Sequence, residues 1–569
     1  MSLPTASTTG KIEFSLRSIK RQIPASRNIL QLFRAVVLIF LRSLPLYFTA
    51  DCFSIPSSNS SMTMANSTAT SSLAVGAAAA STTSKKLYDV AVVGGGLAGL
   101  TASYRILQQR PEAKILLLEA NSKNLGGRVL SSTTLGNVDL GPAWFWPRDQ
   151  PFMRNMVREL KLNPVEQADA FSGEMRLRGG IGAIVEKLKE SLHLLGGNKV
   201  AASGETTSNP AGGAQMKAQV EADLPVDVKL GEKLVKMEKA SSTSVDGEGT
   251  STSTKIVRLH TTATTPMLTS NVDQQANNRS YEAKQVILAV PPKIAMRDVK
   301  MTAQDFPYLL GNPKLVNEMK SQPVWMAGMG KLVLFYDTRW WNAARANQTP
   351  MGPMRSKYGA FQIYDAGEVQ ADAAVEGDSS AKRKLYALAF FVGGEQGGQE
   401  ITTDMMAAKV VEQLQVGAAS RGGRGPFGGS LRMNQMMSFG SSSDDDSHAQ
   451  ATTSTIANYA HAEFKFWATE PAINPDFDAM SAGGVGRGMI YPAHPHPIRG
   501  LNDEVMVKNK SSSSSAVDHL RRVWFGNSEA AEEWSGMLEG AVRAAERAAD
   551  LVVNALEAEE EAVGQNLEL

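Results

Sequence analysis

Residues 89–128 read DVAVVGGGLAGLTASYRILQQRPEAKILLLEANSKNLGGR, and this stretch decides the fold. An apolar run at residues 90–93 predicts a buried parallel strand, because strands covered on both faces are continuously hydrophobic. Gly94, Gly96 and Gly99 follow at the spacing G-x-G-x-x-G, and residues 100–109 then show helical periodicity. A strand, a tight turn and a helix in this order are typical of a dinucleotide-binding unit, with the pyrophosphate at the helix N-terminus.

An acidic residue narrows the choice of dinucleotide. A second apolar strand, residues 115–118, ends at Glu119. A carboxylate there can accept hydrogen bonds from a ribose, and it would repel the 2′-phosphate of NADP. Gly126-Gly127-Arg128 adds a second glycine turn and a cation suited to the same pyrophosphate. FAD or NAD is therefore favoured over NADP, provided that strand, helix and acid occur together, since glycine turns also form plain loops.

Length, charge and cysteine content exclude several classes of protein. The chain has 569 residues, which favours two domains. Its 58 Lys and Arg nearly balance 57 Asp and Glu, so no global field favours nucleic acid or an anionic membrane. Cys52 is the only cysteine, which excludes an internal disulfide framework and a cysteine metal cluster. Redox chemistry would need a bound cofactor, and the expected partners are small molecules.

The first 85 residues are predicted to be a targeting segment and a tether. Residues 1–50 hold many basic side chains and one acid, Glu13, among serines and threonines, which is typical of a transit segment to a plastid or mitochondrion. The apolar run at residues 35–41 leaves a secretory signal as an alternative. Translation that starts at Met62 or Met64 would remove the targeting segment altogether.

Segments of biased composition interrupt the rest of the chain. Four are interpreted as surface insertions: residues 201–224, 238–254, 417–452 and 509–516. The third contains RGGRGPFGG, which can bind RNA but is interpreted as a flexible loop. Strand-like and helical segments mix between the insertions, which indicates an α/β or α+β architecture. Near the end, a strand and a glycine turn precede a helix predicted from Gly536 to about Glu557, followed by an acidic tail, residues 556–569.

Seven motifs in order along the chain resemble the flavin-containing amine oxidase family, which includes the monoamine and polyamine oxidases. They are VVGGGLAGL (92–100), LLLEA (116–120), LGGR (125–128), VDLGPAW (138–144), YEAKQVILAVPP (281–292), GKLVLFYDTRWW (330–341) and FGNSEAAEEWSGMLEGAVRAAERAA (525–549). The resemblance implies an α/β fold with a discontinuous, Rossmann-like FAD domain and a second α+β substrate domain built on a mixed sheet. The implied FAD domain comprises residues 86–160, 215–320 and 479–555, and the substrate domain residues 161–214 and 321–478.

The resemblance also implies which residues bind FAD. The glycine turn, the ribose acid and the GGR arginine would hold the ADP portion, Leu234 the adenine, and Glu529 the ribityl or pyrophosphate portion. The N-terminus of the final helix would face the flavin ring and stabilise negative charge. The full set is Gly94, Gly96, Leu97, Ala98, Gly99, Glu119, Gly127, Arg128, Gly141, Leu234 and Glu529.

For the chemistry, the resemblance points to Lys331. It matches the family lysine that holds a water near flavin N5, and its other interpretation is a surface lysine at the start of a strand. The implied substrate pocket contains Trp144, Trp340, Trp341 and Met537, although buried aromatic residues are as often ordinary core.

The chain departs from the family at two points. Where monoamine oxidases attach flavin through a GGC-aromatic motif, residues 483–486 read GGVG, so the FAD is expected to be noncovalent. The two rings that flank an amine in the family are replaced by Gly486 and Met537, and Tyr491 is another candidate wall. His494 and His496 are interpreted as loop residues, and no metal is expected.

Three functional hypotheses follow from these residues. The first is an FAD-dependent oxidase that removes hydride from a C–N bond, with oxygen as acceptor. The second is a flavin desaturase or porphyrinogen-type oxidase of a large apolar substrate, favoured by the absent rings. The third is a flavin-binding protein with weak or lost catalysis. No nucleic-acid partner and no C-terminal membrane anchor are expected.

Overall fold

A computed structural model describes residues 86–132, 135, 138–167, 173–194, 225–245, 251–264, 278–326, 329–341, 359–372, 382–393, 401–419, 453–470, 473, 498, 501 and 521–567. All of them fall in one compact unit, Thr82–Leu569. The predicted targeting segment (1–85) lies outside the described residues, as do two predicted insertions (201–224 and 509–516) and all of a third beyond Ala419.

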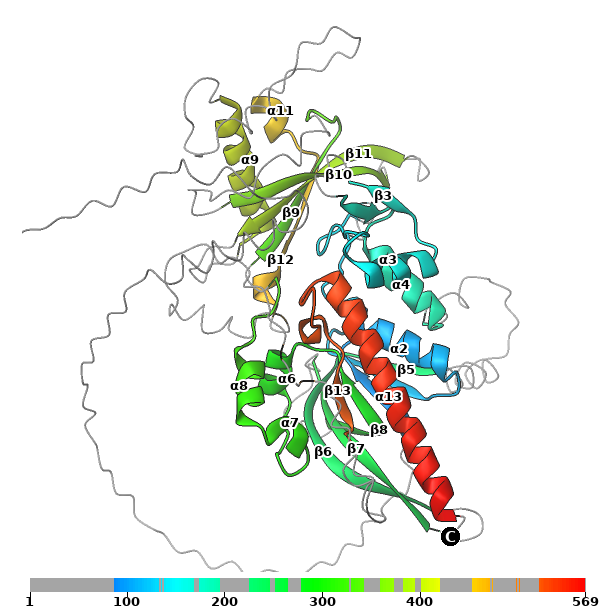
Figure 1. Ribbon diagram of the computed structural model, residues 1–569. Coiled ribbons are helices and arrows are strands. Elements are labelled where there is room, and N and C mark those ends of the chain that lie inside the picture. Colours follow the sequence, from blue (N-terminus) through cyan, green and yellow to red (C-terminus); the bar gives the residue numbers. More distant parts are fainter. Residues whose placement is uncertain are drawn as a thin grey trace, which may run out of the picture. The chain divides into compact units, whose positions relative to one another are not determined.

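One sheet carries the glycine turn (Figure 1). Its strands among the described residues are β1 Leu87–Val93, β2 Ile115–Glu119, β5 Val226–Leu230, β6 Glu232–Val245, β7 Ser251–Ala263, β8 Asn278–Leu288 and β13 Val523–Phe525. The order is β5-β2-β1-β8-β7-β6. Strands β5, β2, β1 and β8 pair in parallel, and β13 pairs in parallel with the carboxyl half of β8, while β7 pairs antiparallel with β8. The carboxyl ends of the parallel strands therefore meet at one edge, where ligands bind in open α/β sheets.

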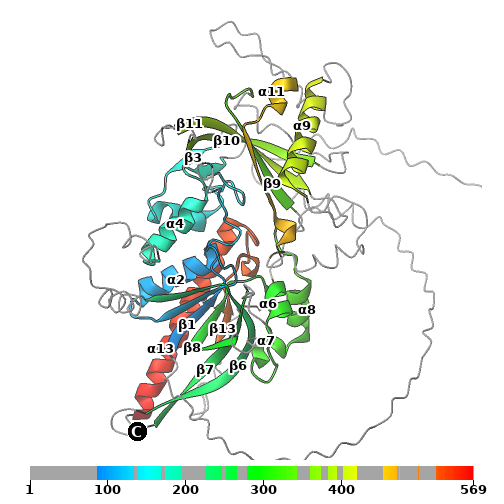
Figure 2. The same cartoon turned by 180° about the vertical axis from the view of Figure 1, so that it is seen from behind.

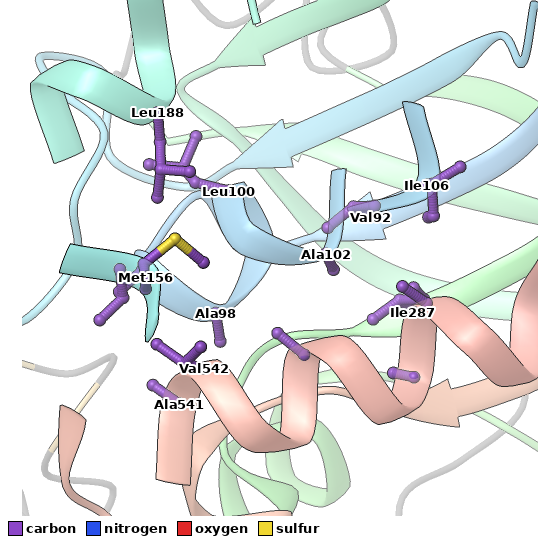
Figure 3. Packing of buried hydrophobic residues seen from close by; sticks show 14 of the residues in the cluster. Val92, Ala98, Leu100, Ala102, Ile106, Met156, Leu188, Ile287, Ala541 and Val542 are labelled. Carbon is purple, nitrogen blue, oxygen red and sulfur yellow. The ribbon is translucent and has the colours of Figure 1, made fainter. Parts of the chain in front are cut away.

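Residues of β1 alternate between two cores because successive side chains in a strand point to opposite faces. Val90 and Val92 belong to one hydrophobic cluster with helices α2 (Leu97–Gln109) and α13 (Leu538–Leu567). Ala91 and Val93 belong to another, with residues of β6, β7 and helices α6 (Pro292–Asp298), α7 (Pro307–Leu310) and α8 (Pro313–Ser321). Figure 3 shows α13 lying along α2, where Ala98 meets the Ala541 and Val542 side, so small side chains allow the two helices to approach closely.

A second sheet is antiparallel and has the strand order β10-β11-β9-β12. Its strands are β9 Met329–Tyr336, β10 Gly359–Asp372, β11 Lys382–Gly393 and β12 His461–Phe466. Helix α9 (Thr403–Ala419) covers one face, packing on Leu332 and Leu334. Val333 and Phe335 point the other way and pack on the segment 138–144. This face therefore meets the residues that follow the glycine turns in sequence.

The remaining described elements are α3 Pro151–Glu159, β3 Pro164–Glu166, β4 Met175–Leu177, α4 Gly182–Ser191, α6 Pro292–Asp298, α7 Pro307–Leu310, α8 Pro313–Ser321, α11 Thr453–Ala457, η2 Trp467–Thr469 and η4 Ser528–Ala530. Figure 2 shows α6, α7 and α8 beside β6, as in the opposite view. Among the described residues, none of the helices has the length and apolar character needed to cross a membrane.

The predicted α/β fold class is confirmed, and the predicted bounds of the final helix are wrong. One predicted insertion, residues 238–254, is largely strand: β6 and β7 pair across most of that stretch, leaving residues 246–250 undescribed. Serine and threonine suit a strand as well as a loop, so their abundance did not indicate strands here. The final helix begins at Leu538 and continues to Leu567, so the predicted acidic tail is helical through Leu567. Glutamate and alanine are strong helix formers, and acidity alone does not end a helix.

Candidate functional site

One cavity of about 1660 Å³ joins the two sheets' functional residues. Such a volume exceeds the roughly 300–1,000 Å³ typical of small-ligand pockets. At the first sheet its lining includes Gly94, Gly96, Leu97, Ala98, Glu119, Gly127, Arg128, Gly141 and Leu234. Towards the second sheet the lining includes Trp144, Met329, Gln362, Phe391, Trp467 and Met537. The structure thus brings most of the predicted cofactor and pocket residues to one continuous space.

The three glycines of the first turn have different structural requirements. Gly94 has a φ of +105°, in the left-handed region that favours glycine. A Cβ on Gly99 would lie 1.9 Å from the Gly94 carbonyl oxygen, so α2 packs against the turn only because Gly99 has no side chain. A Cβ on Gly96 would meet nothing closer than 3.8 Å. Gly96 is therefore not required for packing, and its open side is available for the approach of a ligand.

The first turn of α2 and Glu119 provide complementary contacts for a dinucleotide. The N-cap of α2 is Gly96, which offers no side-chain cap, so the early N–H groups of the helix are suited to an anion. Glu119 accepts hydrogen bonds from the backbone N–H of Gly95 at 2.7 Å and of Asn121 at 2.7 Å. These bonds fix the carboxylate at the end of β2 beside the cavity, and burial raises its pKa above the ordinary value.

Arg128 and Glu529 form an ion pair that closes the cavity wall. Two guanidinium nitrogens of Arg128 donate to the two carboxylate oxygens of Glu529, at 2.6 and 3.0 Å. Glu529 is fully buried, whereas the Arg128 side chain is 23% exposed and lines the cavity. Burial acts to raise the pKa of Glu529, but Arg128 and Ser528 hold it below the ordinary value. Glu529 does not itself line the cavity: it was predicted as a cofactor contact, and the structure instead places it behind Arg128.

Gly141 lies between the glycine turns and the second sheet. A Cβ there would lie 2.0 Å from the Arg128 carbonyl oxygen, so only glycine allows the two segments to touch. Nζ of Lys331, on β9, donates to the Gly141 carbonyl oxygen at 2.7 Å. The indole N–H of Trp467 donates to the Leu140 carbonyl oxygen at 3.0 Å. Strand β9 and the short helix η2 therefore hold this segment through two buried side-chain donors.

Lys331 is fully buried directly behind the cavity wall. Its Nζ lies 5.1 Å from the ring centre of Phe391 and 5.2 Å from that of Tyr364. Gly141 and Phe391, which flank Lys331, both line the cavity. Burial lowers the pKa of Lys331 from 10.5 to about 7, while the charge of Asp139 acts to raise it. An amine with such a pKa can gain and lose a proton near neutral pH.

The predicted aromatic residues separate into two groups. Trp144 lines the cavity and packs edge-on against Tyr364 (4.9 Å) and Phe391 (5.8 Å). Trp340 and Trp341, also predicted as pocket residues, instead pack with Tyr336 beneath α9. The alternation of β9 accounts for this, because Tyr336 and Lys331 are separated by an odd number of positions and point to opposite faces.

Several lining residues were not predicted from the sequence. Trp146 lines the cavity and stacks on Trp534, with ring centres 6.1 Å apart. Its place two residues after Trp144 is the one signal that could have identified it. Gln362 and Trp467 come from segments without a recognisable motif. The predictions for Cys52, residues 483–486, Tyr491, His494 and His496 fall outside the described residues.

Comparisons with known proteins complete the description. Residues 92–160 match the family model of the NAD(P)-binding Rossmann-like domain. The chain is similar to a solved, redesigned putrescine oxidase, with 15% identity over 82% of this chain and 99% of that one, and a TM-score of 0.43. It is similar to cyclohexylamine oxidase from Brevibacterium oxydans IH-35A, with 15% identity over 83% and 99% and a TM-score of 0.38. A candidate protoporphyrinogen oxidase from Exiguobacterium sp. 255-15 gives 12% identity over 81% and 98%, and a TM-score of 0.39. The family match over residues 92–160 confirms the Rossmann-like fold predicted from residues 89–128.

Proposed function

We propose that this protein is an FAD-dependent oxidoreductase of the flavin-containing amine oxidase family, which removes hydride from a C–N bond of an amine and uses oxygen as the acceptor. The observation that carries the proposal is the single cavity that runs from the glycine turn to the wall in front of Lys331. A site for nucleotide binding alone would not need the aromatic end or the buried lysine.

The residues present fit FAD. The Gly96 side of the turn is open, Glu119 is fixed by Gly95 and Asn121, and Arg128 presents a cation to the cavity. The cavity then continues past Gly141 to Met537, just before α13 begins, where the helix N-terminus favours negative charge. Bound there, FAD would supply the hydride acceptance and the transfer of electrons to oxygen.

The chain's own residues would orient the substrate and manage protons. Trp144 and Phe391 offer apolar walls that exclude water from the reacting end. Lys331, with its pKa near 7, can position a water molecule and exchange a proton with it. Its hydrogen bond to the Gly141 carbonyl leaves two donor positions on the ammonium group.

A second candidate is a desaturase or porphyrinogen-type oxidase that acts on a large apolar substrate. It is favoured by the described lining at the second sheet, which is largely apolar: Trp144, Met326, Met329, Phe391, Trp467 and Ile473. A cavity of this size and character accepts a broad hydrophobic molecule as readily as a small amine.

We further propose that the FAD is noncovalent, because the sole cysteine, Cys52, precedes the glycine turn by some forty residues and lies in the predicted targeting segment. That segment would direct the protein to a plastid or mitochondrion. The division into a discontinuous FAD domain and a substrate domain is proposed on the same resemblance.

The test starts with purified full-length protein and its absorption spectrum. A yellow supernatant after acid precipitation supports noncovalent flavin, and flavin retained in the pellet contradicts it. Anaerobic bleaching is then measured with amines, polyamines, amino acids, and porphyrinogen and carotenoid precursors, and H2O2 is followed in air. Bleaching by amines with H2O2 release supports the first function, and bleaching by the precursors alone supports the second.

Lys331→Met is the matched test of the lysine, with Lys320→Met as the control, because Lys320 is exposed at the end of α8. We expect a loss of turnover in the first variant of about 100-fold, the range of one proton-transfer group, and no change in the second. A flavin that no substrate bleaches would instead favour a binding protein without catalysis.

A further inference from the structure

A partly buried carboxylate lies on the segment that Lys331 itself holds. Asp139 is two residues before Gly141, whose carbonyl oxygen accepts the Lys331 hydrogen bond. Lys331 is fully buried and Asp139 is partly buried, and the charge of the Asp139 carboxylate acts on the lysine. Such interactions are strong where water is excluded.

The structure holds Asp139 as an acceptor. Both carboxylate oxygens accept from the backbone N–H of Ile181 at 2.9 Å, and one accepts from the Ser131 hydroxyl at 3.0 Å. Ile181 is the N-cap of α4, so the carboxylate lies at the N-terminus of that helix. A Cβ on Gly182 would lie 2.3 Å from the Ser131 hydroxyl oxygen, so this glycine keeps the space that Ser131 occupies.

The other charged or titratable groups near Lys331 have partners of their own or stay neutral. Lys465 pairs with Lys331 across β12 and β9, but its ammonium group is bound to Glu470. Arg176, on β4, interacts with Asp365, which also pairs with Arg339. Tyr364 presents its ring to Lys331, and burial raises the pKa of its hydroxyl well above the ordinary value. Asp139 is therefore the one carboxylate of the described residues that acts on the lysine.

We propose that Asp139 is a positioning residue that stabilises the ammonium form of Lys331 and so sets the pH at which the amine behind the cavity wall exchanges its proton. Its consequence for turnover rests on the proposed function, whereas the charge coupling itself does not. Two effects oppose each other at the lysine. Burial favours the neutral amine, and the Asp139 carboxylate favours the charged form.

The direction of the expected effect follows from the lowered pKa of Lys331. Below pH 7 the folded protein carries a buried ammonium at a cost, and that cost disappears as pH rises from about 7 towards the ordinary value of 10.5. The melting temperature of the wild type should therefore rise, relative to that of Lys331→Met, across this window. Removing the Asp139 charge lowers the pKa of Lys331 further, so the rise should begin at a lower pH.

The experiment measures melting temperatures of full-length protein, at saturating FAD, from pH 5 to 10. Wild type is compared with K331M, and D139N with D139N/K331M. We expect the difference curve to move to lower pH by about one unit in the Asp139→Asn background, the lower end of the effect of a nearby opposite charge. D365N and D365N/K331M are the control pair, because Asp365 is a buried carboxylate on β10 that pairs with Arg339 instead.

An unshifted curve in the Asp139→Asn background overturns the proposal, and so does an equal shift with Asp365→Asn. If Asp139→Asn fails to fold, Asp139→Ser takes its place, because it also removes the carboxylate charge and keeps an oxygen that can accept a hydrogen bond, so the shift should have the same direction. No shift there also overturns it. Once a substrate is known, the acid limb of the turnover profile should move with the melting curve. Absence of any substrate would refute the proposed function and leave the melting result intact.

Discussion

The two ends of the cavity are built in different ways. At the glycine turn, backbone groups define the site: Gly94 and Gly99 fix the path of the chain, and the first turn of α2 presents N–H groups. At the other end, the site depends on buried side chains, with Lys331 and Trp467 donating to carbonyl groups of a segment 190 residues or more away in sequence. The first construction is local and, at Gly99, leaves no room for an added atom. The second is assembled from distant segments and depends on charge.

The largest expected effect is on the ion pair between these ends. Arg128→Met leaves the fully buried Glu529 without its cation, and removing one partner of a buried pair costs about 3–5 kcal/mol. Arg383→Met is the control, because Arg383 makes the same two-pronged contact with Asp337 at an exposed site. Its expected cost is about 0–1 kcal/mol. Urea unfolding measures both, and equal costs would contradict the role of burial.

The same ion pair predicts that the stability of the folded protein depends on pH in the acid range. The pKa of Glu529 is lowered in the folded protein, so its contribution to stability is complete above the unfolded value of about 4.5 and is lost as pH falls through the lower folded value. The gap in stability between wild type and Arg128→Met should therefore narrow below pH 4.5. A gap that stays constant down to pH 3 would argue against an ionised Glu529.

A smaller effect is expected for Gly99→Ala. The new Cβ would lie 1.9 Å from the Gly94 carbonyl oxygen, and that contact must be relieved by moving α2 away from the turn. Overpacking of this kind costs roughly 1–3 kcal/mol, and the displaced turn should also lose FAD. Thermal unfolding and flavin content measure the two effects. A variant of normal stability would mean that the helix does not pack as described.

Gly96→Ala tests whether Gly96 is needed for the approach of a ligand rather than for packing. Its Cβ would meet nothing closer than 3.8 Å, so the melting temperature without added FAD should change little. The methyl group would face the cavity, and we expect FAD affinity to fall about tenfold, which is 1.4 kcal/mol. Titration with FAD gives the dissociation constant. Unchanged affinity would show that the pyrophosphate does not approach this glycine.

The smallest effects distinguish the two groups of tryptophans. Trp340→Phe should change stability by less than about 1.5 kcal/mol and leave catalysis unchanged, because Trp340 lies beneath α9 and its buried indole N–H has no hydrogen-bond partner among the residues that the structure describes. Trp144→Phe should alter KM, because that ring lines the cavity. Steady-state kinetics and melting curves of both variants test this difference. A change in KM caused by Trp340→Phe would contradict the placement of Trp340 away from the cavity.

The sequence predicted the local end of the site better than the assembled end. The glycine spacing and Glu119 are readable because the turn, its helix and its acid lie within one short stretch and each has a steric or charge requirement. The position of Trp340 was not readable, because it depends on which face of β9 meets α9. Glu529 was recognised as important, yet its contact with Arg128 spans 401 positions and no local pattern encodes it. The sequence did not indicate that residues 238–245 form a strand, because that strand depends on pairing with β7.

Strand β13 and helix α13 have a consequence for the synthesis of the protein. The strand pairs with β8 on the edge opposite β1, and the helix covers α2, although both come from residues 523–567. A ribosome releases the N-terminal part of the sheet long before these two elements emerge. Until then the apolar surface of α2 that they bury stays uncovered, and contacts of such sequence separation form slowly. We expect nascent chains that end before Val523 to require chaperones and to retain no FAD.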